Sequence, residues 1–373
     1  MAAPGGIVTD ALVSFYERLA RTGVGTIVTG HLFCHPRGKY ARRQTGVYED
    51  RMTPGLRRIA DAVHASGGLA LAQIAHSGSQ SRIAQLEPLA PSPVPNALTG
   101  RMVGAASEED IAEAVQAFAA SARRAVEAGF DGVHIHAANG YLISEFLSPL
   151  TNRREDDWGG DAGRRARFAL AVARAVREVV PEGRALTIKL GVVDAPPGGL
   201  AVGDAVAVAA KLVEAGIDGV EVSCGVMERV GNSAAEYVAV DARRAARDLL
   251  FHRLLAAPAD EAYFVPWAQA LRATVRTTII AVGGMRSTET MCSVLESGDA
   301  DFIAMARPYI REPDLAAQIA AGRTGLVDCT SCNLCLRHEG HHSLRCWRTP
   351  RHRLLEHAAY RLFGGFRWGL PGA

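Results

Sequence analysis

The chain has 373 residues, of which 48% are hydrophobic and 21% charged, with a formal net charge of +2 at pH 7. This composition is typical of a protein with a large apolar core, and it excludes a disordered chain. The small net charge gives no support for nucleic-acid binding.

Other global features bear on the compartment. No apolar run is long enough to cross a membrane, and the start, Met1 to Gly6, lacks the charged-then-apolar pattern of a signal peptide. The seven cysteines therefore indicate reduced thiols or metal ligands rather than a disulfide framework. We expect a cytoplasmic protein without a membrane span.

Helical and extended patterns alternate along the chain. Apolar residues at helical spacing predict helices over residues 9–22, 53–66, 108–128, 162–180, 202–215, 266–275, 289–296 and 313–321. Short apolar runs predict strands over residues 24–29, 69–74, 132–136, 186–190, 220–223, 278–282 and 302–305. This alternation predicts an α/β fold with a parallel sheet, either open or closed into a TIM (β/α)8-type barrel.

Polar or small residues follow nearly every predicted strand, and they favour the barrel. In a closed barrel these strand ends share one rim and can reach one ligand, whereas an open sheet would spread them along an edge. The residues are Gly30, His31, Gln73, His76, His136, Asn139, Lys189, Cys224, Gly283, Gly284 and Arg307. We predict a barrel over residues 1–322 and a C-terminal extension over residues 323–373.

The strand count falls one short of a closed eight-stranded barrel. Seven strands are predicted, and the first recognisable element is a helix. A barrel with a strand missing would leave unpaired edges, which are costly. We therefore expect a TIM-type barrel lacking its first strand in this sequence, with a misplaced start codon as the preferred explanation.

One stretch combines polar groups that folding alone does not require together. Residues 134–153 run from a strand end into a loop that carries Asn139 and Tyr141. With His136, these side chains can converge on one small site. Each residue alone could be an ordinary core or loop residue, but the combination favours a functional site.

The motif His136-Ala-Ala-Asn-Gly-Tyr-Leu-Ile-Ser-Glu-Phe-Leu-Ser-Pro-Leu-Thr-Asn-Arg153 is followed by Asp157-Trp-Gly-Gly160 and Arg165-Ala-Arg-Phe168. It resembles the Old Yellow Enzyme family of FMN-dependent NAD(P)H oxidoreductases, with similarity from about Gly6 to about Leu315. That family is an eight-stranded (β/α) barrel with FMN at the carboxyl-terminal rim. The resemblance implies FMN as cofactor and NAD(P)H as co-substrate.

The resemblance also assigns roles around the substrate. His136 and Asn139 match the pair that hydrogen-bonds a carbonyl or nitro oxygen, and Tyr141 matches the proton donor. Reduced FMN passes a hydride to the β-carbon of an activated alkene, so negative charge develops on the conjugated oxygen. Neutral donors stabilise that charge, and a phenol can protonate the α-carbon.

Further positions match the flavin contacts of the family. Gln73 matches the glutamine on the flavin ring, and Lys189 takes the place of the basic residue near the N1/O2 edge, where its charge would favour the anionic reduced flavin. The phosphate-binding turns correspond to Gly283-Gly284 and to Ala306-Arg307. His134 stands where relatives often have glutamate, and we predict no role for it. The Glu-Asn-Arg segment of the family is replaced by Gly163-Arg-Arg165.

The C-terminal extension carries four cysteines in a C-x2-C-x2-C-x10-C pattern. Cys329, Cys332, Cys335 and Cys346 suit a [4Fe-4S] cluster or a tetrahedral zinc site. The pattern is similar to the cluster-binding segment of trimethylamine dehydrogenase and dienoyl-CoA reductase, which implies an electron-transfer partner protein or a second subunit. The histidines among them, His338, His341 and His342, keep zinc as the alternative.

Three functions remain open from the sequence. The leading one is an FMN-dependent ene-reductase that acts on a small unsaturated carbonyl compound or related acceptor. The second is an iron–sulfur flavoprotein of the dienoyl-CoA reductase or amine dehydrogenase type. The third is a flavin-free degenerate barrel that serves as a binding subunit. We expect a homo-oligomer in each case.

Overall fold

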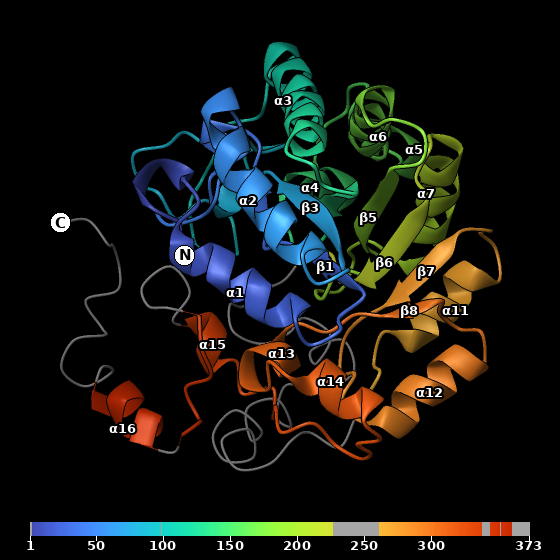
Figure 1. Cartoon of the computed structure of the whole chain (residues 1–373). Helices are drawn as coiled ribbons and strands as arrows, with labels where there is room; N and C mark the ends of the chain where they lie inside the picture. Colours follow the sequence, from blue (N-terminus) through green and yellow to red (C-terminus); the bar gives the residue numbers. More distant parts are fainter. Residues whose placement is uncertain (1, 98, 227–260, 338–343, 351, 360–373) are drawn as a thin grey trace.

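The computed structural model describes residues 2–97, 99–226, 261–337, 344–350 and 352–359. Figure 1 shows the strands gathered inside a ring of helices. The strands are β1 (Thr26–Val28), β2 (Leu32–Phe33), β3 (Leu69–Ala75), β4 (Gly132–Ala137), β5 (Ala185–Gly191), β6 (Gly219–Ser223), β7 (Thr278–Ala281) and β8 (Phe302–Ile303).

The sheet is parallel, curled and open between its first and last strands. Within the described residues its order is β1-β3-β4-β5-β6-β7-β8, with β2 also paired to β3. The edges are therefore β1 and β8. This curled parallel sheet with helices outside it confirms the predicted TIM-type α/β fold.

Most predicted helices form close to their expected ends. They are α1 (Asp10–Ala20), α2 (Thr53–His64), α3 (Glu108–Glu127), α6 (Arg167–Val179), α7 (Val202–Glu214), α11 (Val265–Arg272), α12 (Thr288–Glu296) and α14 (Leu315–Ala320). Side-chain caps explain two starts: Thr9 accepts a hydrogen bond from the Leu12 amide, and Ser107 forms a capping box with Asp110.

Several short elements were not predicted from the sequence. They are β2, α4 (Leu142–Leu147), α13 (Arg307–Arg311), α15 (Leu334–Arg337) and α16 (His352–Ala359), together with a separate α5 (Ala162–Arg165) at the start of the predicted helix 162–180. All of these except α16 are too short to show a periodic pattern. The described residues contain no helix that is both long and apolar enough to span a bilayer.

A row of fully buried β-branched side chains runs across the central strands. Ile74, Ile135, Ile188, Val220 and Ile279 are direct neighbours in the register of β3 to β7, and all are 0% exposed. They belong to one apolar cluster with side chains of the surrounding helices. Because successive strand residues point to opposite faces, the neighbouring polar residues point into the barrel.

Candidate active site at the barrel rim

Three of these inward-facing polar residues lie side by side. His136 of β4 is paired with Lys189 of β5, and Lys189 is paired with Glu221 of β6. His136 and Lys189 were predicted site residues, and the register makes them neighbours. The sequence reasoning missed Glu221, although a single carboxylate inside the apolar run 219–223 was a usable signal.

Lys189 is neutralised by a partly buried ion pair. Its ammonium group is bonded to one carboxylate oxygen of Glu221, and the other oxygen lies 3.0 Å from His134 Nε2. His134 Nδ1 lies 2.7 Å from the Thr187 hydroxyl. Burial alone would raise the pKa of Glu221, but the charge of Lys189 and the contact with His134 hold it well below its usual range. His134 therefore anchors the partner of Lys189.

His136 is placed as a neutral hydrogen-bond donor. Burial lowers its pKa well below the usual value, and the electrostatic effects of His31 and Lys189 act in the same direction. Its Nδ1 accepts a hydrogen bond from the Ala138 amide at 3.3 Å. The neutral ring therefore carries its proton on Nε2, from which it can be donated to a ligand oxygen.

Tyr141 packs directly against His136. The two ring centroids are 4.6 Å apart, and the tyrosine, which occupies the position before α4, is 7% exposed. The Tyr141 hydroxyl oxygen lies 3.4 Å from His31 Nε2. The structure thus brings a neutral imidazole donor and a phenol together at the end of β4.

Asn139 lies in the turn between them. Its φ of 58° is in the left-handed region, which asparagine tolerates better than most residues. The backbone amide donates to the Cys224 carbonyl at 2.8 Å, and the carbonyl accepts from the Gln80 side chain at 2.7 Å. The turn is therefore held from both sides, and the partly exposed Asn139 remains at the rim.

The residues expected to hold FMN fit a flavin phosphate and ring. Gln73 belongs to the inward-facing row of β3 and is paired with His134 of β4. Gly283 and Gly284 follow β7 with φ values of 97° and 74°, and a Cβ on either would lie 2.7 Å from the Tyr263 ring. Only glycine suits such a turn. Consecutive amides there can form an anion-binding nest, as a phosphate requires.

Arg307 links the rim to the C-terminal extension. It begins α13 after the exposed Ala306, and its guanidinium lies 2.5 Å from Asn333 Oδ1 and 3.5 Å from the Tyr263 hydroxyl. Tyr263 is also the side chain that covers the two glycines. The predicted phosphate residue is therefore held between the β7 turn and the cysteine segment.

The four cysteines of the extension surround one cavity of about 20 Å³, which Arg307 also lines. A cavity of that size holds about one water molecule. Burial raises the pKa of Cys329. Among the described residues, no three His, Cys, Asp or Glu side chains are grouped closely enough to bind a metal ion. His338, His341 and His342 lie outside the described residues.

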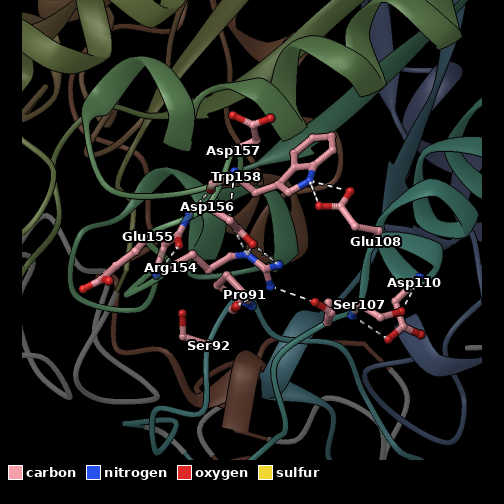
Figure 2. A network of polar contacts seen from close by, with 12 residues as sticks. Pro91, Ser92, Ser107, Glu108, Asp110, Arg154, Glu155, Asp156, Asp157 and Trp158 are labelled. Atoms are coloured by element: carbon pink, nitrogen blue, oxygen red, sulfur yellow. Dashed lines mark hydrogen bonds and ion pairs between the residues drawn. The ribbon is translucent and has the colours of Figure 1, made fainter.

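The segment around Trp158, part of the sequence motif, forms a brace on the outside of the barrel. The Arg154 guanidinium donates to the Pro91 carbonyl at 3.1 Å and to the Asp156 carboxylate at 2.5 Å, within the network of polar contacts in Figure 2. The Trp158 indole donates to the Glu108 carboxylate at 2.8 Å. These bonds join the loop after α4 to the start of α3, so this part of the motif has a structural role.

Glu145 of α4 is a second buried acid near Tyr141, since its backbone amide donates to the Tyr141 carbonyl at 2.8 Å. It was not predicted from the sequence as a functional residue. It is 2% exposed and accepts a hydrogen bond from the Ser79 amide at 3.1 Å. Burial raises its pKa to about 8, although the bonds from Ser79 oppose the shift. The carboxyl is therefore largely protonated below neutral pH.

The chain belongs to the NADH:flavin oxidoreductase / NADH oxidase family, whose sequence model matches residues 1–325. This confirms the family that the residue motifs indicated. The matched residues include His136, Asn139, Tyr141 and Lys189, and they end before the four cysteines.

Individual relatives differ in length and in the reactions that their names give. The chain is 36% identical to a metal reductase of Desulforamulus reducens over 90% of its own length and 48% of that protein. It is 32% identical to a 4,4'-dithiodibutanoate disulfide reductase of Rhodococcus erythropolis, covering 89% and 85% of the two chains. A solved complex of 2-naphthoyl-CoA reductase matches with a TM-score of 0.80 and 26% identity, over 95% of this chain and 54% of that one. The chain thus spans about half the length of the metal reductase and of the naphthoyl-CoA reductase.

Proposed function

We propose that the chain is an FMN-dependent NAD(P)H oxidoreductase that reduces activated alkenes such as α,β-unsaturated carbonyl compounds. The observation that carries this proposal is the pairing of neutral His136 with Tyr141 at one strand end, their rings 4.6 Å apart. Besides a hydride source, the reduction of a polar alkene needs two groups: a hydrogen-bond donor to the substrate oxygen, and an acid that protonates the carbon.

FMN, when bound, supplies the hydride. Gln73 and Lys189 would hold its ring, while the backbone at Gly283 and Gly284 and the turn at Ala306-Arg307 would hold its phosphate. Because Glu221 neutralises Lys189, the attraction of this site for an anionic flavin is weaker than a lone lysine would give.

The remaining steps use the protein's own groups. His136 Nε2–H and the Asn139 amide hold the conjugated oxygen and stabilise the negative charge that grows on it. The O–H bond of Tyr141 then breaks as a C–H bond forms at the α-carbon of the substrate. The phenolate that remains takes a proton from solvent.

The test is anaerobic spectroscopy of the purified protein after incubation with FMN. We expect flavin absorbance to remain after gel filtration, to bleach with NADPH or NADH, and to return when 2-cyclohexenone is added. A colourless protein that FMN cannot restore would contradict the proposal and support the flavin-free binding subunit.

A second candidate is an iron–sulfur flavoprotein that exchanges electrons with a partner protein. It is favoured by the four cysteines that line a single cavity with Arg307. Near four iron and four sulfide per chain, with broad visible absorbance beyond that of flavin, would support it. One zinc per chain, or no metal after anaerobic purification, would exclude it.

A further inference from the structure

We propose that His31 is a positioning residue for Tyr141. Its Nε2–H donates a hydrogen bond to the tyrosine oxygen, directs the phenolic proton away from itself, and stabilises the phenolate once that proton has gone. The proposal rests on the proposed function for the reaction that it serves. The hydrogen bond and its direction follow from residues of the rim alone.

A bulge in the sheet presents His31 to the site. Val28 is paired with Leu71 and Leu32 with Ile74, so three residues, 29–31, stand opposite two, 72 and 73. An extra residue of this kind bends a strand and re-aims a side chain. The His31 ring makes edge contacts with two other rings. Its centroid lies 5.4 Å from that of Tyr141 and 6.3 Å from that of His136.

Gln44 holds the His31 ring in one orientation. Its Oε1 accepts the Tyr40 amide at 2.6 Å, while its Nε2 lies 3.1 Å from the His31 carbonyl and 2.7 Å from His31 Nδ1. A flipped amide would place an oxygen against the carbonyl and an NH2 group against an N–H. The contacts therefore fix Nε2 of Gln44 as the group that faces the imidazole.

The direction of the next hydrogen bond follows. Since Gln44 donates to Nδ1, that nitrogen carries no proton, and the neutral ring of His31 carries its proton on Nε2. Nε2 faces the Tyr141 oxygen at 3.4 Å. The imidazole is thus the donor and the phenol is the acceptor. Protonating Nδ1 would set two N–H groups against each other, so Gln44 also favours the neutral ring.

This arrangement suits a phenol that must lose its proton. When the O–H bond of Tyr141 breaks and a C–H bond forms on the substrate, the electron pair stays on the phenolic oxygen, to which His31 already donates. A hydrogen bond donated to an anion is stronger than one donated to a neutral oxygen. The hydrogen bond from His31 to the Tyr141 oxygen therefore strengthens during the proton transfer. His31 itself gains and loses no proton.

Among the described residues, the titratable side chains in ring contact with Tyr141 include His31, His136 and Tyr40, and the Arg82 guanidinium lies over the Tyr40 ring, 4.7 Å from its centroid. His136 is neutral with its own donor at Nε2, and its ring meets Tyr141 by a tilted contact. The contact of His31 differs, because its Nε2 nitrogen lies against the phenolic oxygen.

The test is a titration of the Tyr141 phenol by NMR. Protein labelled with ¹³Cζ-tyrosine gives one resonance for each of the eight tyrosines, and the Tyr141→Phe variant assigns the relevant one. His31→Phe keeps an aromatic ring but removes the donor. Gln44→Glu keeps the bond to the Tyr40 amide but accepts from Nδ1, which moves the imidazole proton away from Nε2. Tyr40→Phe is the matched control, because it alters another ring neighbour of Tyr141 without touching the donor.

We expect the pH midpoint of the Tyr141 resonance to rise by about one unit in His31→Phe and in Gln44→Glu, and to stay unchanged in Tyr40→Phe. Equal midpoints in the wild type and both of the first two variants would overturn the proposal. The readout needs neither FMN nor turnover. A shifted midpoint together with alkene reduction that is indifferent to Tyr141→Phe would therefore contradict the proposed function and leave the His31 contact standing.

Discussion

The barrel rim and the cysteine segment are both candidates for holding a redox cofactor, yet they are organised in different ways. At the rim the polar groups hold one another: Glu221 pairs with Lys189, and the Ala138 amide fixes the His136 tautomer. In the extension, four thiols surround a cavity of about 20 Å³ without a metal-binding grouping among the described residues.

Charge explains the difference. Opposite charges and matched donors and acceptors attract, so a rim of this kind is organised by the protein itself. Four thiolates repel one another, and burial raises the pKa of Cys329, which favours the neutral thiol. A cluster site is therefore completed by the metal that it binds. Only at the rim can the chemistry be inferred from side-chain positions alone.

The largest expected effect tests whether the two regions are independent. If the second candidate function holds, Cys335→Ser removes one of the four sulfur ligands, and iron content should then fall from near four per chain to near zero, with FMN content unchanged. Metal analysis and flavin absorbance on the same sample measure both. Loss of iron and FMN together would show that the extension also builds the flavin site.

At the rim, the raised pKa of Glu145 can be tested through the pH dependence of the free energy of unfolding. Its pKa is raised from about 4.5 unfolded to about 8 in the folded protein, so its contribution is fully present below pH 4.5 and is lost as the pH rises through 8. Glu145→Gln stays neutral throughout. Urea unfolding should show the wild type losing stability relative to this variant between pH 5 and pH 9, on the order of 2–4 kcal/mol. Parallel pH curves for the two proteins would contradict the raised pKa.

Glu221 tests how the rim sets the charge beside the flavin. Glu221→Gln removes the negative charge next to Lys189, and we expect the reduction potential of bound FMN to rise by about 40 mV. Spectroelectrochemistry measures this shift without turnover. A constant potential would mean that Lys189 and Glu221 do not act on the flavin, and a fall would contradict the expected sign of their effect. His134→Gln, which keeps a donor toward Glu221, is the matched control and should leave the potential nearly unchanged.

The smallest effect concerns the brace in Figure 2. Trp158→Phe removes the indole donor to Glu108, which forms an exposed hydrogen bond, while it keeps an aromatic ring. We expect a loss of about 1 kcal/mol in unfolding free energy and unchanged flavin binding. Chemical denaturation with and without FMN separates the two. Loss of FMN binding would assign this part of the motif a role in the site.

The sequence was informative where one local stretch carries the chemistry. His136 and Tyr141 are five residues apart, on a strand end and the start of the next helix, so the motif alone predicts that they meet. The alternating pattern likewise predicted the fold and most helices, because each element shows its own periodicity.

Partners that meet only through the register could not be predicted in this way. Glu221 is 32 residues from Lys189, and it becomes a neighbour because β5 and β6 pair in one alignment. Gln44 acts on His31 through a loop with no periodic pattern. The sequence alone predicted that the charge of Lys189 favours the anionic reduced flavin. That prediction was incomplete for the same reason, because the opposite charge of Glu221 lies on another strand.

We propose that Tyr141 supplies a proton for alkene reduction at a flavin, and stopped-flow measurement of the two half-reactions in Tyr141→Phe is the decisive test. We expect flavin reduction by NAD(P)H to stay within about twofold of wild type, and reoxidation by 2-cyclohexenone to slow about 10²-fold or more. Equal losses in both half-reactions, or unchanged reoxidation, would contradict it.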